Sequence, residues 1–146
     1  MVNRSMTTGG RPPRGDTRAE LRLLGSVPTF NHAPAALLAA MVDVGRVVQA
    51  APDWPLMLER TAPEKAYVLL DGHVEVRRSG VDLGDCRPGE ILGELGIVHR
   101  RLRSATVLTA TRTTLLHLGR SEFEQLHAEF PYFRDLVGEA MSRKTA

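Results

Sequence analysis

The sequence predicts a mainly β domain, built as an antiparallel barrel, sandwich or jelly roll with helices at both ends. Three observations point to this class. The middle of the chain holds many short apolar segments, separated by turn signals about every eight to twelve residues. No helical pattern lies between these segments, which argues against the strand–helix alternation of a parallel sheet. Apolar residues at helical spacing occur only before and after this block, and 146 residues suit one domain.

The residues before the strand block predict two helices. The first covers about 18–24 and stops at a glycine. Residues 27–30 are expected to be extended, because the residue before a proline avoids the helical region. Asn31 is then the predicted N-cap of a second helix. That helix continues over 35–44 with one apolar face, and Gly45 ends it.

Apolar runs rich in β-branched residues, several of them alternating with polar residues, predict the strands. They lie at 56–58, 66–70, 73–78, 81–83, 104–110 and 113–118. Asp71-Gly72 is a strong two-residue hairpin signal, which predicts that the strands on either side of it pair. Further turns are expected at Ser79-Gly80 and at 87–90.

Two more helices are expected after the strands. Ser121, with Glu124 three residues later, predicts a capping box at the start of the first helix. Pro131 breaks or redirects the chain. A second helix is predicted over 132–141, and its apolar stripe is interpreted as core packing.

The excess positive charge lies in the first 18 residues. The whole chain carries a net charge of +2, but 1–18 contain four arginines against Asp16, and the rest has 15 basic and 16 acidic side chains. This tail is rich in glycine, proline and polar residues and is expected to be disordered. The predicted organisation is therefore a basic tail, 1–18, and one domain, 19–146. The tail has no aromatic residue, so it lacks the stacking groups that single-stranded nucleic acid binding uses.

One segment, 88–107, breaks the strand rhythm and carries the candidate binding chemistry. Gly-Glu-Leu-Gly at 93–96 predicts a single helical turn, whose first backbone N–H groups and partial positive charge suit a phosphate. Arg103 stands nine residues after Glu94, at the start of the next strand, where a guanidinium can bind two phosphate oxygens. An ionised Glu94 can accept a hydrogen bond from a sugar hydroxyl.

Gly-Glu-Leu-Gly at 93–96, a short loop and Arg-Ser-Ala-Thr at 103–106 resemble the phosphate-binding cassette of cyclic nucleotide-binding domains. That family includes catabolite-activator-type bacterial regulators, regulatory subunits of cyclic AMP-dependent protein kinase and cyclic nucleotide-gated channels. Segment 67–76 resembles the central hairpin of the family, and 83–90 resembles its approach to the cassette. The resemblance covers about residues 21–137.

The resemblance implies an eight-stranded antiparallel jelly-roll barrel with the nucleotide inside it. Arg103 and backbone N–H groups of the 93–96 turn would hold the cyclic phosphate. Glu94 would hold the ribose 2′-hydroxyl, and Ser104 the phosphate or the base edge. The last helix, from Tyr132 to about Arg143, would act as a lid over the base. The implied ligand-binding residues are Leu92, Gly93, Glu94, Leu95, Gly96, Arg103, Ser104 and Ala105, with Val76 and Leu83 as apolar neighbours.

The implied function is a sensor or regulatory domain that closes its C-terminal helix on a cyclic nucleotide. Cyclic AMP is preferred and cyclic GMP stays open, because a threonine beside the cassette arginine tends to favour cyclic GMP in this family, and Ser104 is ambiguous. The alternative is a divergent domain without a ligand, used as a protein-interaction or dimerisation module. Three departures bear on it: Leu102 replaces a frequent proline, 61–65 lack the usual glycine and aspartate, and 57–60 lack the usual Gly-Asp turn.

Other function classes find little support in the sequence. The histidines lack metal-ligand spacing, and no nucleophile elbow, Walker sequence or carboxylate pair suggests an enzyme or a catalytic residue. A single cysteine, Cys86, fits a reducing cytoplasm, and no apolar run approaches the ~20 residues of a membrane span. Apart from its ligand, no cofactor is expected. The expected partners are a cyclic nucleotide and an unidentified protein, a second copy of the chain included, but neither nucleic acid nor a membrane. No helix-turn-helix is expected after the last helix.

Overall fold

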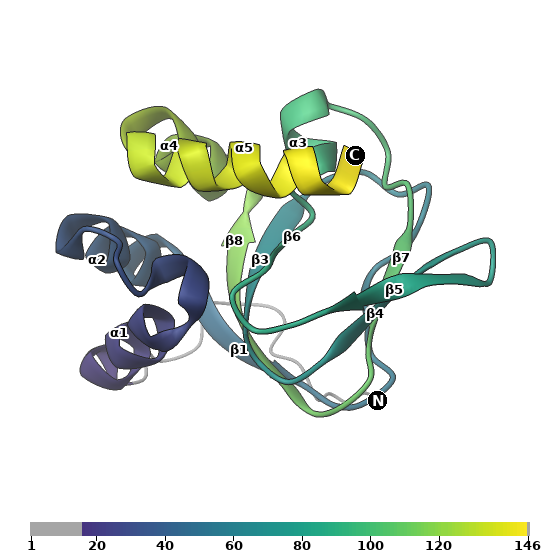
Figure 1. Cartoon of the computed structure of the whole chain (residues 1–146), viewed down its shortest axis with the longest axis horizontal. Helices are drawn as coiled ribbons and strands as arrows, with labels where there is room; N and C mark the ends of the chain where they lie inside the picture. Colours follow the sequence, from purple (N-terminus) through teal and green to yellow (C-terminus); the bar gives the residue numbers. More distant parts are fainter. Residues whose placement is uncertain (1–15, 146) are drawn as a thin grey trace.

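The computed structural model describes residues 16–145, which form two facing β-sheets and a layer of helices (Figure 1). The strands in this range are β1 (Arg46–Ala50), β2 (Pro55–Met57), β3 (Lys65–Asp71), β4 (Val74–Arg78), β5 (Val81–Cys86), β6 (Ile91–Leu92), β7 (Thr106–Thr109) and β8 (Thr113–Gly119). The helices are α1 (Thr17–Ser26), the 3₁₀ helix η1 (Pro28–Phe30), α2 (Ala35–Val44), α3 (Glu94–His99), α4 (Arg120–Glu129) and α5 (Pro131–Thr145). The expected disordered tail falls mostly on 1–15, outside the described residues, but its last two residues are helical, because α1 begins at Thr17.

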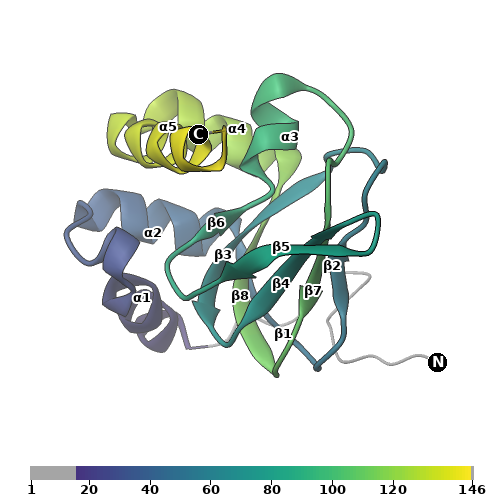
Figure 2. The ribbon, with the colours of Figure 1, turned by 45° about the vertical axis from the view of Figure 1, so that its right-hand side comes forward.

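The strands alternate between the sheets in a jelly-roll order. One sheet runs β1-β8-β3-β6 and the other β2-β7-β4-β5, and every pair is antiparallel. Apart from the β4–β5 hairpin, neighbouring strands thus come from distant parts of the chain, as two interleaved Greek keys produce. The predicted fold class is confirmed. Figure 2 shows α1 and α2 on the opposite side of the first sheet from the second sheet.

Two apolar cores lie on the two faces of the first sheet. The inter-sheet core draws on all the strands, through Val48, Ala50, Leu56, Met57, Tyr67, Leu69, Val74, Cys86, Leu92, Val107 and Leu115. The helical core lies between this sheet and the helices, and includes Leu24, Phe30, Leu37, Met41, Ala66, Val68, Leu116, Phe123, Phe133 and Val137. Alternate residues of β3 enter opposite cores, which explains why β3 is buried at every position from Ala66 to Leu70.

The predicted hairpin at Asp71-Gly72 is wrong. The turn exists, and Gly72 has the expected positive φ of 107°. However, β3 pairs with β6 and β8, whereas β4 pairs with β5 and β7 in the other sheet. The turn therefore carries the chain across the gap between the sheets. By contrast, the turn at Ser79-Gly80 does join a paired hairpin, β4–β5.

The N-terminal boundaries also differ from the expectation. Val27 is extended, as the residue before a proline should be, but Pro28–Phe30 form a 3₁₀ helix because Pro28 favours a first helical turn. Asn31 ends that turn in a helical conformation, so it is not the cap of α2, whose N-cap position is taken by Pro34. The helix predicted at 35–44 and its end at Gly45 are confirmed.

Two further corrections concern the ends of the strand block. Strand β1 is absent from the sequence prediction, because it follows directly after Gly45 and its five residues do not alternate strictly between polar and apolar. The capping box at Ser121 is also wrong, since α4 starts one residue earlier, directly from the end of β8. Gly119 occupies the N-cap without a side-chain hydrogen bond, and the Ser121 hydroxyl contacts the Glu122 carboxylate instead. The apolar stripe predicted for the last helix is buried at Phe133, Val137 and Ala140.

Candidate functional site

The segment that the sequence singled out forms a sharp turn between β6 and α3. Gly93 lies at this turn in the left-handed region, with φ at 90°. A β-carbon there would lie 2.6 Å from Met57 Cε and 2.9 Å from Arg103 Nη1. Backbone conformation and space therefore both require glycine. The predicted helical turn is present, and it extends to His99.

Arg103 reaches back beneath this turn from the loop before β7. Its side chain is buried, with 6% of the residue exposed. Nη1 donates to the carbonyl of Gly93 at 2.7 Å, and Nη2 donates to the carbonyl of Lys65. The backbone of Arg103 is held as well, since its N–H donates to the Thr61 carbonyl at 2.9 Å. Burial lowers the pKa of the guanidinium, whereas Tyr67, Glu94 and Glu64 act in the opposite direction.

Glu94 is the first residue of α3 and has no exposed surface. Its Oε1 accepts a hydrogen bond from Lys144 Nζ at 2.8 Å. Its Oε2 has no hydrogen-bond partner among the described residues. A buried carboxylate oxygen without a donor is costly, so this atom is a candidate acceptor for a ligand hydroxyl.

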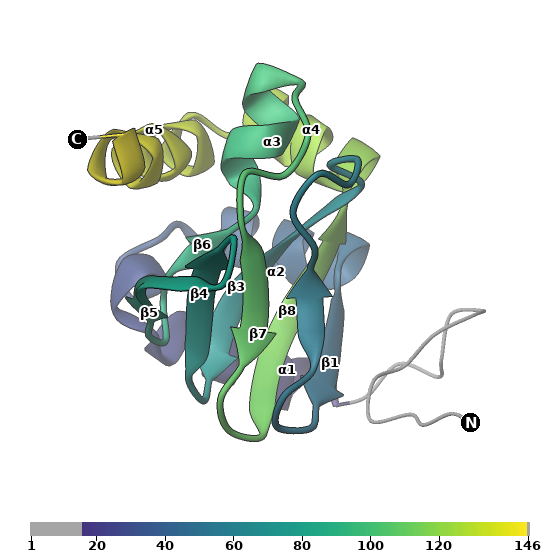
Figure 3. The same cartoon turned by 90° about the vertical axis from the view of Figure 1, so that its right-hand side faces the viewer.

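The site is bounded by the last turn of α5 as well as by the cassette. The Lys144 ammonium also donates to the carbonyl of Ile91 at 2.8 Å, at the first residue of β6. Helices α3, α4 and α5 lie at the same end of the molecule, as Figures 1 and 3 show. A side chain from the C-terminal helix thus joins the strand and the helix on either side of Gly93.

These residues surround one cavity of about 390 Å³, a size typical of ligand pockets. Every ligand-binding residue expected from the sequence lines it: Val76, Leu83, Leu92, Gly93, Glu94, Leu95, Gly96, Arg103, Ser104 and Ala105. The structure therefore brings together groups from β4, β5, β6, α3 and the loop before β7. Whether they bind a nucleotide stays a prediction.

Several lining residues were not found from the sequence. Arg143 and Lys144 come from α5, Arg78 from the end of β4, and Cys86 from the end of β5. The basic pair has an ordinary explanation, because cations are favourable in the last turn of a helix. The two basic residues were visible in the sequence, but they indicated the end of a helix as readily as a binding site. Burial raises the pKa of the Cys86 thiol to about 12, and the neighbouring Glu90 adds to this shift.

Charge around the cavity is predominantly positive. Its cations are Arg78, Arg101, Arg103, Arg143 and Lys144, and its carboxylates are Asp85, Glu90 and Glu94. Each carboxylate accepts a hydrogen bond within the fold, from His73, Arg87 and Lys144 respectively. The lining therefore suits an anion better than a cation.

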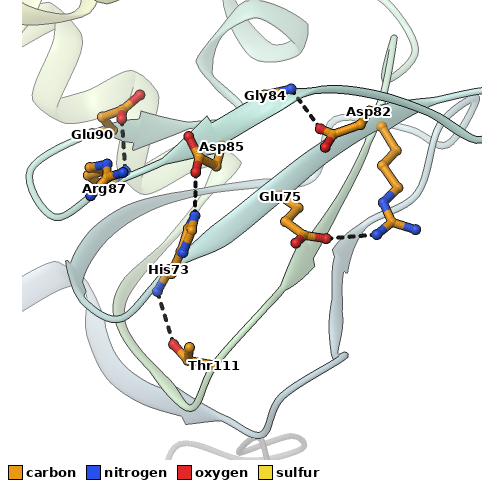
Figure 4. A network of polar contacts seen from close by, with 9 residues as sticks. His73, Glu75, Asp82, Gly84, Asp85, Arg87, Glu90 and Thr111 are labelled. Atoms are coloured by element: carbon orange, nitrogen blue, oxygen red, sulfur yellow. Dashed lines mark hydrogen bonds and ion pairs between the residues drawn. The ribbon is translucent and has the colours of Figure 1, made fainter.

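One wall of the cavity is held by a polar network along the β4–β5 hairpin and the turns beside it, shown in Figure 4. His73 Nε2 lies 2.6 Å from Asp85 Oδ2, and the His73 backbone N–H donates to Thr111 Oγ1 at 3.1 Å. Beyond it, Asp82 accepts from the Gly84 N–H at 2.9 Å, next to the bulge where β5 shifts its pairing with β4. These partly exposed contacts fix the β5 edge rather than add a second site.

Across residues 16–145, no acidic, histidine or cysteine cluster could hold a metal ion. None of the helices described is long and apolar enough to cross a bilayer.

A family model of the cyclic nucleotide-binding domain matches residues 47–130, more than half of the chain. The chain belongs to this family. The match spans β1 to α4 and contains the whole cassette. The family resemblance inferred from the sequence is thus confirmed.

Individual relatives agree with this assignment. The chain is 30% identical over 135 residues to the cyclic nucleotide-gated potassium channel mll3241 of Mesorhizobium japonicum, covering 91% of this chain and 36% of the channel. It thus spans little more than a third of that relative. The regulatory domain of Toxoplasma gondii PKA with cAMP superimposes with a TM-score of 0.74 at 17% identity, over 87% of this chain and 50% of that one. The regulatory subunit of a cAMP-independent protein kinase A from Trypanosoma brucei superimposes with a TM-score of 0.74 at 17% sequence identity, over 88% of this chain and 45% of that one. These structural matches show the fold alone.

Proposed function

We propose that this cyclic nucleotide-binding domain is a sensor that takes a cyclic nucleotide, with cyclic AMP preferred to cyclic GMP, into the cavity at its cassette. The observation that supports this most is the meeting of a buried guanidinium, Arg103, and a buried carboxylate oxygen without a partner, Glu94 Oε2, at one cavity. The first offers charged donors to a phosphate, and the second offers an acceptor to a ribose hydroxyl. Apolar lining from Val76, Leu83 and Leu92 suits the flat faces of a base.

The C-terminal helix is the element we expect to respond to the ligand. Arg143 and Lys144 place the last turn of α5 at the cavity, so a bound nucleotide meets this helix and the cassette together. We propose that binding closes α5 more tightly over the base. Amide hydrogen exchange across 131–145 should then slow when cyclic AMP is added. Unchanged exchange at saturating ligand would contradict this step.

Substitution of the two cavity arginines of the cassette loop tests the site. Arg103→Ala should weaken cyclic AMP binding at least about tenfold in calorimetry, because charged hydrogen bonds to the phosphate are lost. Arg101→Ala is the matched control, since Arg101 is exposed, lines the same cavity and should change affinity by less than about threefold. Arg103→Lys, which keeps the charge, guards against a folding defect, and unfolding midpoints are compared first. Equal affinities for the two alanine variants would overturn the proposal.

A second candidate function has an observation of its own. The Arg103 guanidinium donates to two carbonyls of the fold, and Glu94 is paired with Lys144, so both groups also serve the structure itself. A domain that had lost its ligand and acted as a protein-interaction or dimerisation module would keep such contacts. Thermal unfolding separates the two candidates. A nucleotide at 100 times its dissociation constant adds roughly 2.7 kcal/mol, whereas no shift with cyclic AMP or cyclic GMP would favour the module.

A further inference from the structure

The ion pair between α5 and the cassette joins the two ends of the functional region. Lys144 lies in the last turn of α5, and Glu94 is the first residue of α3, 50 positions earlier in the chain. Their charged atoms lie 2.8 Å apart, and the same ammonium donates to the carbonyl of Ile91. One side chain therefore fixes the end of α5 to both β6 and α3.

The burial of the two partners is unequal, and this decides what the pair does. The Glu94 side chain has no exposed surface, whereas 30% of the Lys144 side chain is exposed. A fully buried carboxylate needs a compensating charge, and removing one partner of a buried pair leaves the other uncompensated. Lys144 thus supplies the countercharge to the Glu94 carboxylate at the wall of the cavity.

The pair also fixes which oxygen of Glu94 is available. Oε1 is taken by Lys144, while Oε2 has no partner in the range 16–145. A carboxylate rotates about its last side-chain bond, so without the ammonium neither oxygen would hold a defined direction. With it, one oxygen is engaged and the other is held ready to accept.

We propose that Lys144 is a positioning residue, which acts through Glu94 to set the preference of the cavity for a ligand with a ribose hydroxyl and which couples α5 to that contact. This inference rests on the proposed function, and adds to it the residue through which helix and ligand are linked. Lys144 itself need not touch the ligand. The prediction is that the hydroxyl preference depends on a residue of the last helical turn.

The test compares cyclic AMP with 2′-deoxy cyclic AMP, which lacks the hydroxyl, on full-length variants by calorimetry. The wild-type protein should bind cyclic AMP about tenfold more tightly than the deoxy compound, as loss of a hydrogen bond to a charged group predicts. Lys144→Met should reduce this ratio to within about threefold, and Lys144→Arg should restore most of it. Arg134→Met is the control on the same helix and should keep the wild-type ratio, because Arg134 is exposed and does not line the cavity.

The double variant shows whether Lys144 acts through Glu94. In the Glu94→Gln background, Lys144→Met should have little further effect on the ratio, because the two side chains form one unit. A Lys144→Met variant that keeps the wild-type ratio would overturn the proposal, and so would an equal loss in Arg134→Met. Tighter binding by Lys144→Met would also overturn it, since Lys144 would then be competing with the ligand for Glu94.

A ligand-free measurement separates failure of this inference from failure of the proposed function. If the wild-type protein binds neither compound, the proposed function fails and the ligand part of the inference falls with it. The helix coupling is then decided by a double-mutant cycle on urea unfolding with Lys144→Met, Glu94→Gln and both together. Non-additive losses support the coupling of α5 to the cassette, and additive losses refute it.

Discussion

Single residues carry charge into an otherwise apolar interior at the cassette. Arg103 and Glu94 are both buried, and each is compensated by a specific partner from a distant part of the chain. This pattern separates them from Arg100 and Arg101, which are exposed on the neighbouring loop. The sequence singled out Arg103 because it stands just before a predicted strand. It gave no indication that backbone carbonyls of Gly93 and Lys65 would receive its donors.

His117 provides a residue-scale prediction about pH. Burial first, and then the charges of Arg46 and Lys65, lower its pKa from 6.5 to about 4. Between these values the unfolded chain binds the proton more readily than the folded one, so the free energy of unfolding should fall as pH decreases from about 6.5 to about 4. His117→Gln should remove this part of the pH dependence in urea unfolding.

The control for this prediction is His99→Gln, which removes an exposed histidine at the end of α3. Carboxylates also titrate in this range. The informative quantity is therefore the difference in the free energy of unfolding between each variant and the wild-type protein at each pH. If the free energy of unfolding of His117→Gln depends on pH as it does in the wild-type protein, the half-buried His117 ring contributes nothing to the loss of stability in acid.

At the scale of elements, the turn from β6 into α3 depends on one glycine. Gly93→Ala meets two penalties: a positive φ, and a β-carbon 2.6 Å from Met57 Cε and 2.9 Å from Arg103 Nη1. Gly84→Ala is a matched control, because Gly84 also has a positive φ, of 125°, but no atom lies within 4 Å of its added β-carbon. Gly93→Ala should therefore lower the free energy of unfolding by about 1–3 kcal/mol more than Gly84→Ala does, as measured by urea unfolding. Equal losses would mean that the packing against Arg103 is unimportant.

The elements also show where local patterns mislead. Residues 66–70 form the expected strand, yet they do not pair with β4, which follows after the turn at Asp71-Gly72. The hairpin signal reports only the local backbone conformation. Partner choice depended on burial of both faces of β3, which sheet packing on one side and helices on the other demand.

For the whole molecule, the first sheet links two cores that we expect to unfold together. Phe133 lies in the helical core, where its ring packs edge-on against Phe123 at 5.4 Å. Leu69 lies in the inter-sheet core, against which Trp54 packs. Phe133→Ala should cost about 3–5 kcal/mol. It should shift the urea midpoint of helical circular dichroism and that of Trp54 fluorescence together, because β3 and β8 belong to both cores.

Leu69→Ala gives the complementary measurement from the other core and should also move both signals. The chain has one tryptophan, so the fluorescence reports on one place. Phe133→Ala could shift the urea midpoint of the circular dichroism and leave that of the Trp54 fluorescence unchanged. That result would show that the two cores unfold separately. That result would contradict the expectation of one cooperative unit.

The sequence by itself determined the fold class, most strand positions and the order of the cassette residues Gly93, Glu94 and Arg103. These features depend on spacing within short segments, which turn chemistry and strand alternation encode directly. Only the tertiary structure decided that β3 and β4 lie in different sheets, that Lys144 pairs with Glu94 and that Arg103 donates to Lys65. The two side-chain contacts join residues that are distant in sequence, and the placement of β3 and β4 follows from strand pairings between distant parts of the chain. Such contacts are selected by the joint burial of both partners, which no local pattern specifies.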